Sequence, residues 1–106
     1  MKKFIIIFSI IPLFSISQIK IYYDNGAIEK EFISKYVPEK EEYQYHGDYK
    51  EWYKNGNLMS EGLYSYDLKY GFWSEYTEDG KIQRIEYYYF GYLTDEWKSF
   101  HKNGNI

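Results

Sequence analysis

The side chains with which this chain could do chemistry are two histidines and a scatter of carboxylates. His46 and His101 are the only histidines among the 106 residues. Metal binding or general-base catalysis would need a histidine to converge with carboxylates, and these two lie far apart in the sequence. We expect both imidazoles to be exposed to solvent. There is no cysteine, which excludes a thiolate metal site and a disulfide framework.

The carboxylates do not form a recognisable ligand set. A calcium site needs several oxygens on one compact loop, and the stretches DNG at 24–26 and EDG at 78–80 contain suitable residue types. Hairpin turns explain both stretches without a metal, and the glutamates of 39–42 are typical of a solvated loop. The serines lack a nucleophile-elbow context, and there is no glycine-rich phosphate loop. We therefore predict a non-enzymatic protein with no catalytic residue, no metal and no cofactor.

The first 17 residues, MKKFIIIFSIIPLFSIS, have the layout of a secretory signal peptide. Lys2 and Lys3 form a positive start, an apolar run follows over 4–14, and the small residues of 15–17 precede Gln18. The run is shorter than the roughly 20 residues of a membrane span. We predict cleavage before Gln18, export to the periplasm or the extracellular medium, and no stable membrane insertion afterwards. A buried N-terminal strand and an uncleaved anchor are the alternatives.

The composition of residues 18–106 predicts a thin sheet whose core is partly accessible to water. Loss of the two leader lysines moves the formal net charge from −3 to −5, which disfavours nucleic acid and anionic membrane surfaces as partners. This part contains fifteen Tyr, four Phe and three Trp, but only four Leu, seven Ile and one Val. A sandwich core needs alternating aliphatic residues, whereas tyrosine has a large ring with a hydroxyl that needs water or a partner.

The chain repeats one pattern four times. The turn glycines recur at intervals of 30, 24 and 24 residues: Gly26, Gly56, Gly80 and Gly104. One column of side chains stands seven residues before them: Ile19, Tyr49, Trp73 and Trp97. An aromatic column stands four residues before them: Tyr22, Trp52, Tyr76 and Phe100. An aliphatic column stands two residues after them: Ile28, Leu58, Ile82 and Ile106.

Each unit reads as a β-hairpin. The turn glycines follow Asn or Asp, and such dipeptides tolerate positive φ at both centres of a tight turn. The strands before the turns are aromatic, which suits a pleated, half-buried surface, and second reversals are expected near 66–67 and 90–91. We predict an all-β fold, an elongated, single-layered antiparallel meander of stacked hairpins. The units are 19–46, 47–70, 71–94 and an incomplete 95–106.

Three details of this meander stay open. The two aromatic columns are three residues apart, so either both faces carry aromatic rows or a bulge corrects the register. The longer first interval holds six additional residues within KYVPEKEEYQYHG at 35–47, where Pro38 and the charges after it suit a longer loop. The strand around 97–101 is expected to lack a hairpin partner, so either its open edge pairs with a second copy of the chain or the end is a truncated or frayed tail.

The stretch GDYKEWYKNGNLMSEGLYSYDLKYGFWSEYTEDGKI resembles the MORN-repeat-variant family of bacteria. The resemblance runs from Gly47 to Gly104, with a weaker first copy at 19–28. It departs from the family pattern at Asp95, in place of the leading glycine, and at 66–67, where the family often has Asn-Gly. It implies an elongated sheet of stacked hairpins, used as a binding or scaffolding surface, without catalytic apparatus. Many members carry the label of an antitoxin component.

The leading functional hypothesis is an exported, non-enzymatic module for protein–protein interaction or scaffolding, with an unidentified protein partner. The predicted binding residues are aromatic rings of the two columns: Tyr49, Trp52, Trp73, Tyr76, Trp97 and Phe100. The alternative reading of these rings is that they supply the apolar packing of the sheet. Alternative functions are an antitoxin or immunity-type protein that neutralises a toxin, and binding of a cell-wall carbohydrate or choline-type ligand.

Overall fold

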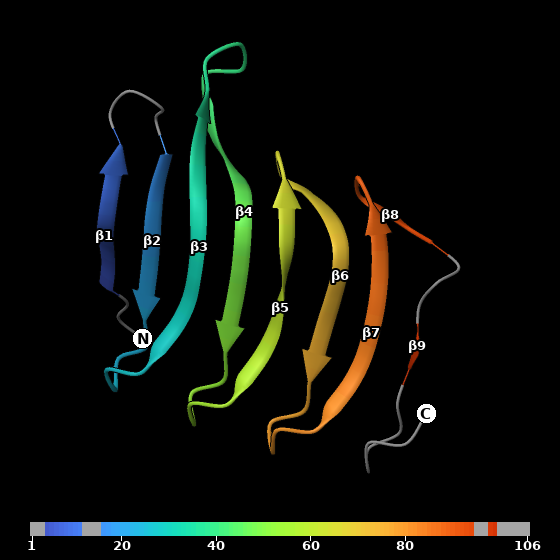
Figure 1. Cartoon of the computed structure of the whole chain (residues 1–106). Helices are drawn as coiled ribbons and strands as arrows, with labels where there is room; N and C mark the ends of the chain where they lie inside the picture. Colours follow the sequence, from blue (N-terminus) through green and yellow to red (C-terminus); the bar gives the residue numbers. More distant parts are fainter. Residues whose placement is uncertain (1–3, 12–15, 95–97, 100–106) are drawn as a thin grey trace.

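The chain folds into one antiparallel sheet of nine strands in a computed structural model that describes residues 4–11, 16–94 and 98–99, with side chains described for 16–94. Strands β1 to β8 follow one another across the sheet in chain order, and β9 pairs with β7 (Figure 1). The bounds are β1 Phe4–Ile11, β2 Ile16–Tyr22, β3 Ile28–Val37, β4 Glu42–Trp52, β5 Leu58–Ser65, β6 Leu68–Tyr76, β7 Ile82–Tyr89, β8 Tyr92–Leu93 and β9 Lys98–Ser99.

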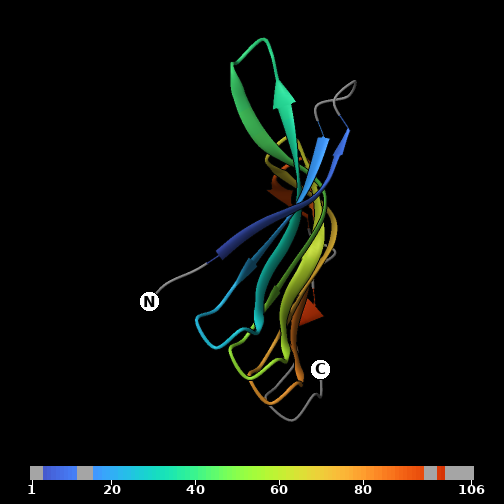
Figure 2. The ribbon, with the colours of Figure 1, turned by 90° about the vertical axis from the view of Figure 1, so that its left-hand side faces the viewer.

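The sheet is twisted and has no second layer among the described residues. Figure 2 views it nearly edge-on, and its extents are 46 × 37 × 19 Å. No helix occurs in this part of the chain, and none of these residues forms a helix long and apolar enough to cross a membrane. The prediction of an all-β, single-layered meander of hairpins is confirmed.

The turns at the glycines differ from the predicted tight turns. At the first of them, the Gly26 amide donates to the Tyr23 carbonyl at 3.0 Å and the Tyr23 amide donates to the Ala27 carbonyl at 2.8 Å. Only the glycine has positive φ, 89° at Gly26, and Asn25 does not. This is a three-residue loop that ends in a left-handed glycine. The expectation of positive φ at both turn centres is therefore wrong at these turns, and the same loop recurs at Gly56 and Gly80.

The second set of reversals contains the tight two-residue turns. Ser65 pairs with Leu68, and Tyr66 and Asp67 between them have φ of 46° and 68°. Phe90 and Gly91 make the equivalent turn one repeat later, with φ of 45° and 89°. These turns confirm the predicted positions of the second reversals. Positive φ at tyrosine and phenylalanine is costly, so the surrounding hairpin must hold it in place.

A bulge recurs in the return strand of each hairpin and decides which side chains share a face. In β5 the extra residue is Met59, because Glu51 pairs with Ser60 and Trp52 pairs with Leu58. Glu29 and Gln83 occupy the same place in β3 and β7. β4 and β6 also contain irregular pairing, at 46–48 opposite β3 and at 71–73 opposite β5. Between the two columns, at 49–52 and 73–76, no extra residue lies in the strand before the turn, so side chains alternate there. The two aromatic columns therefore lie on opposite faces.

We call the face that carries Tyr49 and Trp73 the core face, and the face that carries Trp52 and Tyr76 the open face. The core face holds the best-packed cluster of rings: Phe32, Tyr45, Tyr49, Tyr64 and Trp73. Tyr49 is 7% exposed and Trp73 is 4% exposed, although among the described residues only side chains of their own sheet surround them. The stability of the sheet depends on these ring contacts.

Trp73 lies flat over Gly62 of the neighbouring strand. A Cβ atom built on Gly62 would lie 2.2 Å from Cδ2 of Trp73, so only glycine leaves room for the indole. The indole Nε1 donates to the Leu63 carbonyl at 2.9 Å, which fixes the ring orientation. Its centroid is 5.6 Å from that of Tyr49 and 4.9 Å from that of Tyr64.

The six additional residues of the first interval lengthen a hairpin instead of forming only a longer loop. The β5–β6 hairpin ends at the pair Ser65 and Leu68. Compared with it, the β3–β4 hairpin contains two further residue pairs, Tyr36 with Tyr43 and Val37 with Glu42. The remaining two residues enlarge the turn, which becomes the four-residue loop 38–41. The extension is the part of β3 and β4 that projects beyond the other hairpins in Figures 1 and 2.

Side chains near the turns connect each repeat to the next. The Tyr23 hydroxyl donates to the Trp52 carbonyl at 2.6 Å, and the Tyr53 hydroxyl, one repeat on, donates to the Tyr76 carbonyl at 2.8 Å. Asn55 Nδ2 likewise donates to the backbone carbonyl of Glu78 at 3.0 Å. These bonds span neighbouring repeats and fix their offset.

Two of the sequence predictions concern the ends of the chain. Phe4–Ile11 forms β1 and pairs with β2, from Phe4 opposite Tyr22 to Ile11 opposite Ile16, so this part of the predicted leader is a strand in the uncleaved chain. The signal peptide and the unit boundaries remain predictions. Of the fourth unit, Lys98–Ser99 pairs with Ile85 and Arg84. The expected open edge around 97–101 lies otherwise outside the described residues.

Candidate functional site

The predicted binding residues fall into three groups in the structure. Tyr49 and Trp73 are buried in the ring cluster of the core face, where each contacts the other. Trp52 and Tyr76 are half-buried on the open face. Trp97 and Phe100 lie outside the described residues. The structure therefore brings Tyr49 and Trp73 together and places Trp52 and Tyr76 on the opposite face of the sheet. The binding role of all six residues remains a prediction.

The tyrosine hydroxyls of these columns are bonded to carboxylates. The Tyr49 hydroxyl donates to Glu51 Oε1 at 3.0 Å, and burial, reinforced by the charge of Glu51, raises the pKa of Tyr49 far above its usual value. The Tyr76 hydroxyl donates to Glu61 Oε2 at 3.0 Å, and burial together with this bond raises the pKa of Tyr76. A phenol with a raised pKa is a poor acid, so both groups serve as hydrogen-bond donors.

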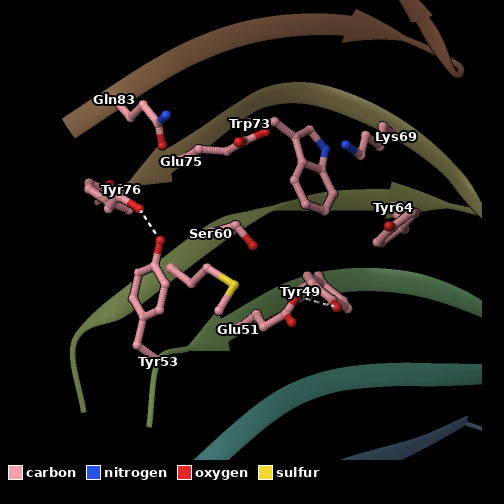
Figure 3. A pocket seen from close by; sticks show the side chains of 11 residues that line it. Tyr49, Glu51, Tyr53, Ser60, Tyr64, Lys69, Trp73, Glu75, Tyr76 and Gln83 are labelled. Carbon is pink, nitrogen blue, oxygen red and sulfur yellow. Dashed lines mark hydrogen bonds between the residues drawn. The ribbon is translucent and has the colours of Figure 1, made fainter. Parts of the chain in front are cut away.

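A hollow lies beside the ring cluster of the core face, as Figure 3 shows. Its volume is about 210 Å³, below the roughly 300–1,000 Å³ that is usual for small-molecule sites. Ser60 lies between Glu51 and Glu75, which are its partners on the two neighbouring strands. Figure 3 also shows Tyr53 reaching across to Tyr76. The hollow is a gap between packed side chains and is too small for a typical small-molecule ligand.

The charges on the core face are already matched within the sheet. Arg84 Nη2 lies 2.6 Å from Glu75 Oε1, and Arg84 Nε lies 3.7 Å from Glu86 Oε1. The bond to Glu75 raises the pKa of Arg84. The ammonium of Lys69 lies 4.7 Å from the ring centroid of Trp73 and 5.0 Å from that of Tyr88, a cation–π arrangement. Arg84 and Lys69 on the core face are thus engaged with carboxylates and rings of the same sheet.

The open face carries a cluster of exposed apolar side chains over β5, β6 and β7. Register and ring contacts place six residues together there, which we call the Phe72 patch: Leu63, Leu68, Tyr70, Phe72, Tyr87 and Tyr89. Phe72 is 65% exposed, and its ring centroid lies 4.8 Å from that of Tyr87. Leu63, Leu68 and Tyr89 are also exposed. Contiguous exposed apolar surface of this kind marks interaction sites.

A row of charged side chains borders the Phe72 patch on the open face. Lys20, Glu31, Lys50 and Glu61 stand opposite one another on four successive strands, so the sign of the charge alternates along the row. Opposite charges at directly paired positions stabilise a sheet. A hollow of about 370 Å³ lies at the boundary, and its lining includes the charged Asp48, Lys50 and Glu61 as well as Leu63 and Phe72.

His46 has a structural contact. Its Nδ1 accepts a hydrogen bond from the Tyr66 amide at 3.1 Å, and the two rings lie 4.1 Å apart. Burial and the nearby charge of Lys35 lower the pKa of His46. The imidazole is therefore half-buried, contrary to the expectation of an exposed side chain. His101 lies outside the described residues, and among the described ones no three potential metal-binding residues of the His, Cys, Asp or Glu type come together.

The sequence predictions did not include the Phe72 patch. Phe72 and Trp73 are neighbours in the chain, and in a strand they must point to opposite faces. The repeat columns identified Trp73, which is buried, and passed over Phe72, which is exposed. The adjacency of Phe72 and Trp73 was a usable signal. Neighbouring strand residues point to opposite faces, so in a single-layered sheet packing on one face leaves the other ring without cover.

The repeat and the open sheet define the class: a protein built from tandem β-hairpins. Residues 45–66, which span most of the β4–β5 hairpin, match the family described as MORN repeat variant. This match supports the resemblance to MORN-repeat proteins and fits a repeat module for protein or ligand interaction. It gives no support to the label of an antitoxin component. No curated protein and no solved structure gives a match.

Proposed function

We propose that this protein is an exported, non-enzymatic repeat module that binds another protein through the Phe72 patch. The observation that carries the proposal is an aromatic side chain, Phe72, that is 65% exposed within an apolar cluster, on a face that no other described strand covers. The core face needs its rings for packing. The open face therefore offers the surface whose burial costs the fold nothing.

The chemistry of the Phe72 patch favours a protein partner over a small ligand. Its tyrosines combine a large apolar ring with a hydroxyl, a combination enriched at protein interfaces. The hollow beside it is open to solvent and bordered by Asp48, Lys50 and Glu61, which suits a polar rim. A flat apolar centre with a charged border has the arrangement of a protein–protein interface.

Export forms part of the same proposal and rests on the sequence of residues 1–17. The positive start, the short apolar run and the small residues before Gln18 support it. The measurement is the intact mass and the N-terminal residue of the protein recovered from the cell envelope and the medium. Gln18 as the first residue outside the cytoplasm would support export, and an uncleaved cytoplasmic chain would contradict it.

Site-specific photo-crosslinking in the producing cells tests the binding function. A benzophenone amino acid replaces Phe72 in one variant and Tyr43 in the other. Tyr43 is a matched control, because it is 67% exposed but lies on the β3–β4 extension, away from the patch. We expect a discrete cross-linked product from position 72 and none from position 43. Equal products from both positions, or none from position 72, would refute binding through the patch.

A further inference from the structure

We propose that the partner of the Phe72 patch is a second copy of this chain, packed face to face about a two-fold axis. This inference rests on the proposed function, because it names what covers the same surface. In the resulting dimer, the open faces of two sheets form the inside of a two-layered sandwich. The core faces remain outside, with their own ring clusters intact.

The architecture of the sheet lacks the second layer that such a sandwich supplies. Stable domains bury an apolar face of a sheet against another element. The described strands β2 to β7 contact one another only side by side, and no described segment lies over the open face of β5, β6 and β7 (Figure 2). The fold covers Tyr49 and Trp73 with rings of the same face, but Phe72 and Leu63 receive no such cover. A second sheet would provide it.

The absence of charge in the patch favours a copy of the same chain. In a two-fold symmetric interface the same surface meets itself, so a charged patch would oppose like charges. None of the six residues of the Phe72 patch is charged. The nearest charges lie at its border and include both signs: Asp48, which pairs directly with Leu63, and the paired Lys50 and Glu61. The patch can therefore face itself without repulsion, and its hydroxyls can meet water or the other copy at the edge.

The size of the open face is sufficient for a stable dimer. Specific interfaces bury about 800 Å² on each partner, with an apolar centre and a polar rim. The sheet extends 46 Å by 37 Å in its two long directions. The patch fills only part of one face, and the charged row from Lys20 to Glu61 continues from it. Patch and row together provide the centre and the rim.

Sedimentation velocity on the purified protein over a wide concentration range tests the inference. We expect a dimer, and we expect Phe72→Glu to raise its dissociation constant roughly 30-fold or more, as at an interface hot spot. Tyr43→Glu, at an equally exposed aromatic position outside the patch, should leave dimerisation unchanged. Leu63→Lys is a second variant within the patch and should act like Phe72→Glu. Circular dichroism and the Tm of each variant verify that it is folded.

The outcomes separate this inference from the proposed function. A monomer at every concentration, or a dimer unaffected by Phe72→Glu and Leu63→Lys, would overturn the dimer. If position 72 then cross-links to a different protein in cells, binding through the patch stands while self-association fails. If position 72 yields no product and the protein is a monomer, both proposals fail. A cross-linked product of twice the chain mass supports both.

Discussion

The contact between Gly62 and Trp73 predicts that Gly62→Ala lowers the free energy of unfolding. In Gly62→Ala the new Cβ would lie 2.2 Å, 2.3 Å and 2.6 Å from three atoms of the indole, Cδ2, Cε2 and Cγ. These atoms belong to the rigid centre of the ring, so the whole side chain must move. Overpacking of this kind costs about 1–3 kcal/mol.

Movement of the indole adds a second cost. The hydrogen bond from Trp73 Nε1 to the Leu63 carbonyl, 2.9 Å long, would be strained or lost, at about 0.5–1.5 kcal/mol. The ring contacts of Trp73 with Tyr49 and Tyr64 would also loosen. We expect the free energy of unfolding to fall by about 2–4 kcal/mol in total, a large part of the roughly 5–15 kcal/mol typical of a domain.

The assay is urea unfolding followed by far-UV circular dichroism, carried out as a double-mutant cycle. Trp73→Leu removes the ring that the new methyl group would strike, at its own large cost. If the clash is the cause, Gly62→Ala should be nearly neutral in the Trp73→Leu background, because alanine is otherwise better than glycine in a strand. An equal cost of Gly62→Ala in both backgrounds would refute the reasoning. Ser60→Ala, on the same strand and face, is a control with little expected effect.

Two further predictions concern the hydroxyl of Tyr53 and the imidazole of His46. Tyr53→Phe removes the 2.8 Å bond to the Tyr76 carbonyl and should lower the free energy of unfolding by about 0.5–1.5 kcal/mol in the same assay; no loss would show that this bond between repeats is not needed. Because the pKa of His46 is lowered in the folded chain, the unfolded chain binds more protons than the folded chain below about pH 6.5. The free energy of unfolding should therefore fall as the pH is lowered from about 7 to about 5. His46→Gln should remove this slope, and an unchanged slope would contradict it.

The hairpins could be predicted because each one is specified locally. An Asn-Gly or Asp-Gly pair ends an aromatic strand, and a reversal such as that at Tyr66 and Asp67 follows about ten residues later. The turn type could not be predicted from the dipeptide, because the same pair fits a two-residue turn and a three-residue loop. The register of the flanking strands selects the loop, and the register depends on bonds between strands that are not local in sequence.

The assignment of side chains to faces could not be predicted for the same reason. One extra residue moves every later side chain of a strand to the other face. The position of Met59 as the bulge residue, in the return strand, keeps Tyr49 and Trp52 on opposite faces. Had the extra residue fallen between Tyr49 and Trp52, both columns would share one face. Which strand carries the bulge was the missing information.

Phe72 and Trp73 are neighbours in the chain but differ in exposure, and under the proposed function one sheet separates stability from recognition. Trp73 lies over a glycine that admits its ring, and it is 4% exposed. Phe72 pairs across the strand with Tyr87, whose ring meets it edge-on at 4.8 Å and leaves it uncovered. Substitutions on the core face should therefore change the free energy of unfolding, while substitutions of the Phe72 patch should change association. Because the described residues form a single layer, the proposal assigns the two properties to different sides of the same strands.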